Sequence, residues 1–327
     1  MNTDSILKVE QLVKTYPLPS AKIFERKKIF TAVSNVSFEI KKGETVGLIG
    51  ESGCGKTSVG RIITKLLEPD SGKVFFEGQE ISSIKKRDFR EKRSRIQMIF
   101  QDPSTALNPQ FRIGRILREA LFSIGIKRRT DQENRILPLL SRVGMSEEYL
   151  ERYPHELSGG QKQRICILLA LLTNPSLIVA DEVVSALDLS VQAQILNLMR
   201  LLQKEFRLST LFISHDLNII HYMSDRIIVM YMGEIVEYGP CEEVYRKGRH
   251  PYTMLLLSSL LDLNADKTSG EAKDSSELIR EESSCIFYHC CPWRDQLCRE
   301  KKPPFVELGP GHQAKCHHLD IIEASLK

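Results

Sequence analysis

Short apolar runs alternate with helical patterns along most of this chain. The runs are rich in Ile, Val and Leu and too short for helices, which is typical of buried strands. They lie at 45–49, 96–100, 177–180, 210–213 and 226–230. Apolar residues recur at helical spacing at 58–67, 163–172 and 191–206. This alternation predicts an α/β fold around a parallel sheet.

Two stretches depart from this alternation. Shorter strands with turns at Gly43 and Gly78 indicate an antiparallel β subdomain, and a last strand follows Gly233. These strands are predicted at 6–12, 32–40, 73–77, 79–81 and 234–237. From about 102 to 160 the pattern is helical, with apolar faces that include Ile113 and Ile136. We therefore expect a helical subdomain inserted in a domain that spans residues 1–261.

The composition agrees with a large folded core and smaller appended parts. Of the 327 residues, 42% are hydrophobic and 27% charged. No run of 18 apolar residues occurs, so we expect a chain that neither spans a membrane nor carries a visible secretion signal. The net charge of +4 is too small to indicate nucleic-acid binding, and no nucleic-acid partner is expected.

One glycine-rich segment carries the clearest chemical signal. Residues 50–57, Gly-Glu-Ser-Gly-Cys-Gly-Lys-Thr, fit the pattern G-x-x-x-x-G-K-[ST] between a predicted strand and helix. Backbone N–H groups of such a loop surround phosphate oxygens, and the helix N-terminus adds partial positive charge. Lys56 is expected to reach the β- and γ-phosphates, and the Thr57 hydroxyl to bind Mg²⁺. The predicted nucleotide contacts here are Gly50, Ser52, Gly53, Cys54, Gly55, Lys56, Thr57 and Ser58.

Polar residues follow three of the other predicted strands. Asp181 and Glu182 end the strand at 177–180, where an aspartate can hold Mg²⁺ and a glutamate can polarise an attacking water. Gln101 ends the strand at 96–100. His215 follows the strand at 210–213, close enough in such a fold to contact a γ-phosphate.

Two further features each have a structural and a functional interpretation. Tyr16 is either a half-buried strand aromatic or a ring that stacks on a nucleotide base. Ser158, with the glycines that follow it, is either a plain helix N-cap or a start that presents N–H groups to an anion.

Six motifs occur in the order found in the ATP-binding subunits of ABC transporters. They are Walker A at 50–57, the Q-loop at Gln101, the signature motif at 157–161, Walker B at 177–182, the D-loop at Asp188 and the switch histidine His215. Residues 5–260 resemble that family. The resemblance implies a P-loop ATPase that hydrolyses ATP, with Glu182, His215, Gln101 and Lys56 as catalytic residues. It also implies Mg²⁺ held by Thr57, Gln101 and Asp181, and Tyr16 against the adenine.

The resemblance further implies an assembly. Ser158, Gly159, Gly160 and Gln161 of one ATPase subunit, with Asp188, would complete the ATP site of a second subunit. Two membrane-spanning permease subunits and an extracytoplasmic substrate-binding protein are the other expected partners. The chain would then lie peripherally on the cytoplasmic face of the cell membrane.

Two segments narrow the branch of this family. Gln101-Asp102-Pro103 followed by 106–109, Ala-Leu-Asn-Pro, and 250–253, His-Pro-Tyr-Thr, resemble the oligopeptide, dipeptide and nickel importers. Import of oligopeptides or dipeptides is the expected function. The alternatives are a nickel importer ATPase of the same branch or an ABC ATPase without a transport role, such as those of DNA repair or translation.

The chain also departs from the family pattern at two places. Val183-Val184 replaces the usual Pro-Thr after Walker B, and Leu168-Leu169 replaces Ala-Arg in the signature helix. The first change removes a residue that fixes φ, and the second exchanges a cation for an apolar side chain. Every residue with a direct chemical role remains, so we expect the reaction to be kept and its rate to be altered. The two departures also indicate that the two sites of a pair are unequal, so we expect pairing with a different ATPase subunit.

The C-terminal part has a different composition. Residues 262–284 contain seven acidic and three basic residues and are predicted to be a flexible linker. Residues 285–327 then form a small module with cysteines at 285, 290, 291, 298 and 316. Cys285, Cys291, Cys298 and Cys316 match those of the importer branch, which implies a [4Fe-4S] cluster. Zinc, aided by His289, His317 or His318, and unligated buried thiols are the alternatives.

Overall fold

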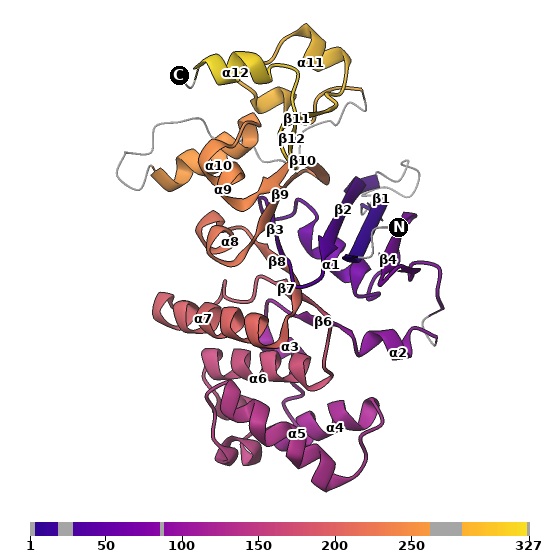
Figure 1. The fold of residues 1–327 in the computed structure, drawn as a ribbon, viewed down its shortest axis with the longest axis vertical. Helices are drawn as coiled ribbons and strands as arrows, with labels where there is room; N and C mark the ends of the chain where they lie inside the picture. The colour runs from indigo at the N-terminus through magenta and orange to yellow at the C-terminus, as the bar shows by residue number, and fades with distance from the viewer. Residues whose placement is uncertain (1–3, 19–28, 86–87, 262–282, 326–327) are drawn as a thin grey trace.

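The computed structural model describes residues 4–18, 29–85, 88–261 and 283–325 (Figure 1). Most of the predicted linker, 262–282, therefore lies outside the described residues. Within the described part, the larger sheet has eight strands in the order β11-β12-β10-β9-β3-β8-β7-β6. Its strands are β3 (Thr45–Ile49), β6 (Ile96–Ile99), β7 (Leu177–Asp181), β8 (Ser209–Ser214), β9 (Arg226–Tyr231), β10 (Glu234–Pro240), β11 (Phe305–Gly309) and β12 (His312–Lys315).

The centre of this sheet is parallel and fully buried. β3 pairs with β8 and β9, and β7 pairs with β6 and β8, all in parallel. β3 and β7 are buried at every position, as expected of strands covered on both faces. The predicted α/β fold is confirmed.

A second sheet lies beside the first and is antiparallel. Within the described residues its order is β2-β1-β4-β5. The strands are β1 (Ser5–Pro17), β2 (Ile29–Lys41), β4 (Ser71–Phe76) and β5 (Gln79–Glu80). Helix α1 (Lys56–Ile63) joins the sheets, because its Val59 and Ile63 pack in one core with residues of both. The predicted antiparallel β subdomain is confirmed (Figure 1).

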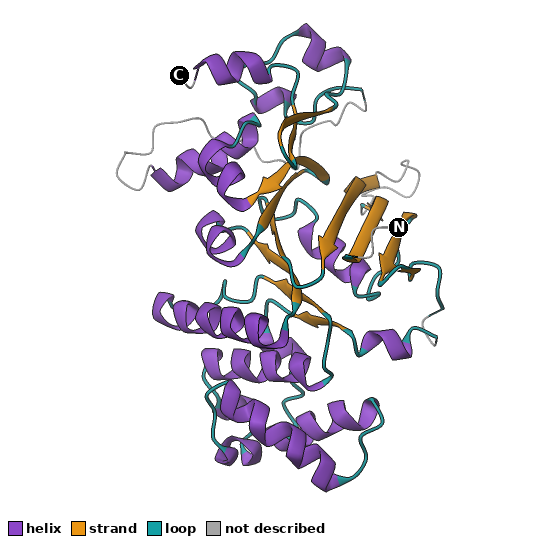
Figure 2. Ribbon diagram, in the orientation of Figure 1, coloured by secondary structure: helices purple, strands orange, loops and turns teal. Residues whose placement is uncertain are grey.

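Helices cover the opposite face of the large sheet and extend beyond its β6 edge (Figure 2). On the sheet face lie α7 (Leu189–Phe206), α8 (Leu217–Met223), α9 (Cys241–Lys247) and α10 (Pro251–Leu261), while α2 (Arg90–Arg93) precedes β6. Beyond the edge lie α3 (Pro103–Ala106), α4 (Ile113–Ser123), α5 (Arg129–Arg142), η1 (Glu147–Glu151), η2 (Pro154–Glu156) and α6 (Gly159–Leu172). Among the described residues, none of the helices is both long and apolar enough to span a membrane.

Several predicted boundaries are wrong by a few residues. α6 begins at Gly159 rather than 163, because Ser158 and Gln161 form a capping box that starts the helix earlier. α1 covers Lys56–Ile63 rather than 58–67, and Lys65 beyond its end has a positive φ of 58°, which is incompatible with a continuing helix. β1 runs on to Pro17 because its end pairs with the start of β2.

The C-terminal module is attached to the large sheet. β12 pairs with β10 through Glu237 and Tyr238, so the hairpin of β11 and β12 extends the sheet at its edge. The remaining elements of the module are η3 (Tyr288–Cys290), α11 (Gln296–Glu300) and α12 (Leu319–Ser325). The sequence pattern did not predict this continuation of the sheet.

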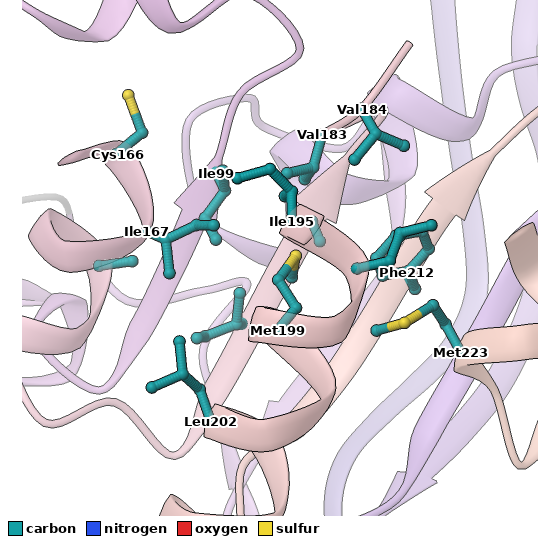
Figure 3. Packing of buried hydrophobic residues seen from close by; sticks show 14 of the residues in the cluster. Ile99, Cys166, Ile167, Val183, Val184, Ile195, Met199, Leu202, Phe212 and Met223 are labelled. Atoms are coloured by element: carbon teal, nitrogen blue, oxygen red, sulfur yellow. The ribbon is translucent and has the colours of Figure 1, made fainter. Parts of the chain in front are cut away.

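The segment after β7 is part of the core. Val183 and Val184 are each 2% exposed and pack near Ile195 and Met199 of α7 (Figure 3). The two valines that replace the usual Pro-Thr therefore bury apolar surface directly beside Glu182.

Candidate active site

The phosphate loop requires glycine at two of its positions. Gly55 has a φ of +103°, and a Cβ there would lie 1.9 Å from the carbonyl oxygen of Ala32. A Cβ on Gly50 would lie 2.1 Å from the carbonyl oxygen of Met230. The loop thus lies against β2 and β9 at a distance that only glycine permits.

Lys56, the first residue of α1, places a positive charge inside the loop. Its Nζ donates hydrogen bonds to the carbonyl oxygens of Gly50 at 2.6 Å and Glu51 at 2.8 Å. The side chain is almost fully buried, with 5% exposed. Loop N–H groups, the N-terminus of α1 and this ammonium group together form a site suited to phosphate.

Thr57 and Asp181 form a pair of oxygen ligands at the end of β7. Thr57 Oγ1 donates to Asp181 Oδ1 at 3.0 Å. Burial raises the pKa of Asp181; the Thr57 hydrogen bond opposes this effect and the nearby charge of Glu182 adds to it. A hydroxyl beside a buried carboxylate is a donor set that suits Mg²⁺, whose charge would favour the ionised carboxylate.

Glu182 is held by the residues that follow the two neighbouring strands. Gln101 Nε2 donates to Glu182 Oε2 at 2.9 Å, and His215 Nδ1 lies 3.3 Å from Glu182 Oε1. The Glu182 side chain is 13% exposed, whereas His215 is 51% exposed. The structure therefore brings together Gln101, Glu182 and His215 from the ends of β6, β7 and β8.

The backbone at Glu182 is unusual. Its φ is +46°, a left-handed conformation that is uncommon for residues other than glycine. The conformation is fixed on both sides, since Glu182 N donates to the Ile213 carbonyl at 3.0 Å and Ser185 Oγ donates to the Glu182 carbonyl at 3.0 Å. Such positions concentrate at functional sites.

Tyr16 lies at the end of β1 beside the phosphate loop. Its hydroxyl is 3.2 Å from Ser58 Oγ, and Lys14 Nζ lies 5.9 Å from the ring centroid. The residue is half-buried in the strand, as one of its two interpretations predicted. The stacking interpretation stays a prediction.

The signature residues start a different helix. Ser158 Oγ accepts from Gln161 N at 3.3 Å, and Gln161 Oε1 accepts from Ser158 N at 2.9 Å, so Ser158 is the N-cap of α6. Within the described part of the chain, no hydrogen bond joins residues 157–161 to the phosphate loop, and α6 lies apart from α1 in Figure 1. Asp188 is exposed at the start of α7. The monomer does not bring these residues to Lys56.

One residue at the phosphate loop was missed as a site residue. Tyr252 Oη accepts a hydrogen bond from the backbone N–H of Glu51 at 2.9 Å. The segment 250–253 marked only the branch of the family in the sequence. Its tyrosine carried no signal for a place beside residues 50–57, because α10 follows that loop by about 200 residues.

The C-terminal cysteines gather in the module. Cys291, Cys298 and Cys316 are buried, Cys285 is half-buried, Cys290 is exposed, and all are free thiols. Burial raises the pKa of the four matched cysteines, and mutual charge repulsion among them adds to this rise. Among the described residues, one group of three donor atoms lies within 4.8 Å of one another, and it comes from Asp295, Cys298 and His318 rather than from the four cysteines.

Comparison with known proteins assigns the family. Residues 33–185 match the family described as ABC transporter, and residues 236–298 match the oligopeptide/dipeptide transporter C-terminal region. The chain belongs to the ABC transporter ATPases. It is an ATP-binding and ATP-hydrolysing subunit that uses ATP and Mg²⁺. This ABC ATPase is 42% identical over 326 residues to the oligopeptide transport ATP-binding protein AppF of Bacillus subtilis, covering 97% of this chain and 98% of the relative.

Another relative and two solved structures support the same family assignment. The glutathione import ATP-binding protein GsiA of Pectobacterium atrosepticum is 46% identical over 97% of this ABC ATPase, which spans 49% of GsiA. A dimeric ATP-binding cassette, MJ0796 bound to ADP and Pi, superposes with a TM-score of 0.64 at 28% identity, covering 72% of this chain and 98% of that one. The CbiO1 structure from Clostridium perfringens gives a TM-score of 0.64 at 25% identity, with 80% and 100% covered.

Proposed function

We propose that this ABC ATPase powers the import of oligopeptides or dipeptides. The observation that carries the proposal is that similarity to peptide-import ATP-binding proteins extends over 97% of the chain. It includes the C-terminal region as well as the catalytic core, since residues 236–298 match the region named for oligopeptide and dipeptide transporters. The names of these relatives favour peptides over nickel.

The proposed catalytic roles follow from the hydrogen bonds at the ends of the strands. Glu182 polarises the attacking water, and Gln101 and His215 hold its two carboxylate oxygens in place. Lys56 and the loop N–H groups bind the phosphates. Thr57 and Asp181, with the Gln101 side-chain oxygen, would hold Mg²⁺, and the ion would neutralise charge on the phosphates.

A second ATPase subunit supplies what the monomer lacks. The signature residues Ser158 and Gly160 are apart from Lys56 in one chain, so a second cassette has to present its own signature motif to this site. The solved MJ0796 cassette is a dimer, which supports pairing of this kind. We propose a different ATPase as partner, because Val183-Val184 and Leu168-Leu169 are departures that a second subunit would balance.

A membrane-spanning permease pair and an extracytoplasmic binding protein complete the proposed importer, with this chain on the cytoplasmic face of the membrane. An apolar groove of about 360 Å³ lies between β6, α4 and α6, directly before Gln101. Met98, Phe100, Ile124, Cys166 and Leu169 contribute to it. We propose that a permease segment docks there, so that its movement reaches Gln101 and Glu182.

A [4Fe-4S] cluster is the proposed content of the cysteine module. Backbone N–H groups donate hydrogen bonds to three of the cysteine sulfurs, an arrangement that stabilises thiolate ligands. The pairs are Phe287 with Cys285, Trp293 with Cys291 and His318 with Cys316. Cys285 N also donates to the Cys298 carbonyl at 2.8 Å, which holds two of the four segments together. These hydrogen bonds would favour four-thiolate ligation, and a bound cluster would cross-link the module.

Transport in a reconstituted system tests the function. The two ATPase subunits and the two permease subunits are reconstituted together in vesicles. With the binding protein, these vesicles should take up labelled oligopeptide only when ATP is present, and ATP hydrolysis should rise when peptide and binding protein are added. The same assembly with Glu182→Gln in this chain is the matched control. Uptake of nickel without peptide uptake would overturn the peptide proposal.

A further inference from the structure

The backbone of Glu51 is held on both sides of its Cα. Its carbonyl oxygen accepts from Lys56 Nζ at 2.8 Å, and its N–H donates to Tyr252 Oη at 2.9 Å. Glu51 directly follows Gly50, at the place where the loop leaves β3. The hydroxyl of Tyr252 thus fixes one end of the segment whose other contacts position Lys56.

Tyr252 is itself fixed by packing. It is completely buried, and its ring lies 4.5 Å from Tyr231 and 5.8 Å from Phe287, measured between centroids. Its backbone N–H donates to His250 Nδ1 at 3.1 Å. A buried ring held on several sides has little freedom to move its hydroxyl away from the loop.

Phe287 belongs to the cysteine module. It is 4% exposed and contacts both Tyr231 and Tyr252, so it closes the ring cluster from the C-terminal side. The segment that carries it is anchored at the cysteines, because its N–H bonds the sulfur of Cys285 and its carbonyl accepts from Cys290 N at 3.1 Å. The position of Phe287 therefore depends on the fold of the module.

A second connection joins the module to the same segment. Glu237, which is fully buried, accepts from the backbone N–H groups of Arg249 and His250 at 2.9 Å each. His312 of β12 contacts the same carboxylate, with Nε2 at 2.8 Å from Oε1. The turn that leads into Tyr252 is thus held on a carboxylate shared with the module.

We propose that Tyr252 is a positioning residue for the phosphate loop and that Phe287 of the C-terminal module holds it there. ATP affinity then depends on the integrity of a module from which none of the predicted nucleotide contacts comes. The proposal rests on the role of residues 50–57 in ATP binding.

The first test is Tyr252→Phe, which removes the hydroxyl and keeps the ring. The dissociation constant for ATP should rise about three- to tenfold, the effect of one hydrogen bond, while kcat at saturating ATP stays within about twofold. Amide hydrogen exchange in the peptide containing Glu51 should become faster without nucleotide. Tyr231→Phe is the matched control, because the Tyr231 hydroxyl forms its hydrogen bond with Cys290, whereas Glu51 of the loop acts on it only through its charge.

The second test is Phe287→Leu, with Phe305→Leu as control. Phe305 is an aromatic of the same module that contacts Tyr238 and is 38% exposed. Only Phe287→Leu should weaken ATP binding and speed exchange at Glu51. Unchanged affinity and exchange in both Tyr252→Phe and Phe287→Leu would overturn the proposal. A wild-type chain that bound no ATP would instead overturn the nucleotide site. The two failures are distinguishable, because exchange at Glu51 is measured without nucleotide and does not require ATP binding.

Discussion

The side-chain amide of Gln101 donates a hydrogen bond to the carboxylate of Glu182 at 2.9 Å, although 81 residues separate the two in the sequence. The contact arises from the register of two parallel strands, in which Ile99 of β6 lies opposite Ala180 of β7. Glu182 directly follows β7, and Gln101 is the second residue after β6. The helical subdomain that begins at Asp102 is therefore connected directly to the proposed catalytic carboxylate.

Replacing Glu182 by glutamine tests its role as general base. Glu182→Gln keeps the size of the side chain and its contact with Gln101 but removes the charge. We expect ATP binding to persist and steady-state hydrolysis to fall by about 10²- to 10⁴-fold. Retention of more than about a tenth of wild-type turnover is incompatible with this role. Glu147→Gln, at an exposed carboxylate on η1, is the control and should leave the rate unchanged.

The isolated chain should be a weak ATPase. Its signature residues do not contact its own phosphate loop, so full activity requires a second cassette. We expect turnover to increase when a related but different ATPase subunit and the permease pair are added. A stable ATP-dependent homodimer of the purified chain with full activity would show that the heterodimer proposal is wrong.

Much of the core could be predicted because its signals are local. A strand such as 177–181 is a continuous apolar run that ends in a carboxylate, and the phosphate loop places its glycines within eight residues. Parallel strands then bring their carboxyl ends to one edge, so Gln101, Glu182 and His215 were expected near each other. Boundaries were less predictable, since the start of α6 depends on hydrogen bonds between Ser158 and Gln161.

Contacts that join distant segments could not be predicted in the same way. β12 has four residues, of which only Ala314 is apolar, so no period identified it as a strand that continues the main sheet. Its pairing depends on the exposed edge of β10. Likewise, the bond from Glu51 to Tyr252 depends on packing around Phe287, and no local pattern encodes it.

The cysteine module should contain a visible chromophore. Anaerobically purified chain is expected to be brown, with broad visible absorbance that disappears in Cys298→Ser. Cys290→Ser is the matched control, because Cys290 is exposed and lies outside the four-cysteine set, and it should keep the colour. Colourless anaerobic protein with stoichiometric zinc would contradict the cluster, and protein without any metal would leave the cysteines a packing role only.

A substitution in the apolar groove before Gln101 should affect partner binding without affecting catalysis. Leu169→Arg places a cation in this groove, which Phe100 and Cys166 also line. If a permease segment covers it, the unpaired charge should reduce co-purification of the permease pair about tenfold or more. The ATPase rate of the isolated chain should not change. Phe122→Arg, on the exposed side of α4, is the control, and equal loss of permease in both variants would argue against docking in the groove.

The last prediction concerns acid sensitivity and depends on His250. This histidine is 1% exposed, and burial lowers its pKa from 6.5 to about 4, with the charge of Glu237 opposing part of the effect. Its Nδ1 accepts from Tyr252 N, so the folded protein requires the neutral imidazole.

Between about pH 4 and pH 6.5 the unfolded chain binds a proton at His250 that the folded chain does not. The stabilisation is therefore fully present above pH 6.5 and is lost as the pH falls toward 4. In this window the free energy of unfolding should decrease by up to about 1.4 kcal/mol per pH unit from this group.

Chemical denaturation at several pH values measures the slope. His250→Asn keeps an acceptor near Nδ1 and should flatten the slope, whereas His155→Asn, at an exposed position, should not. Equal slopes for wild type and His250→Asn would mean that His250 does not control the acid sensitivity.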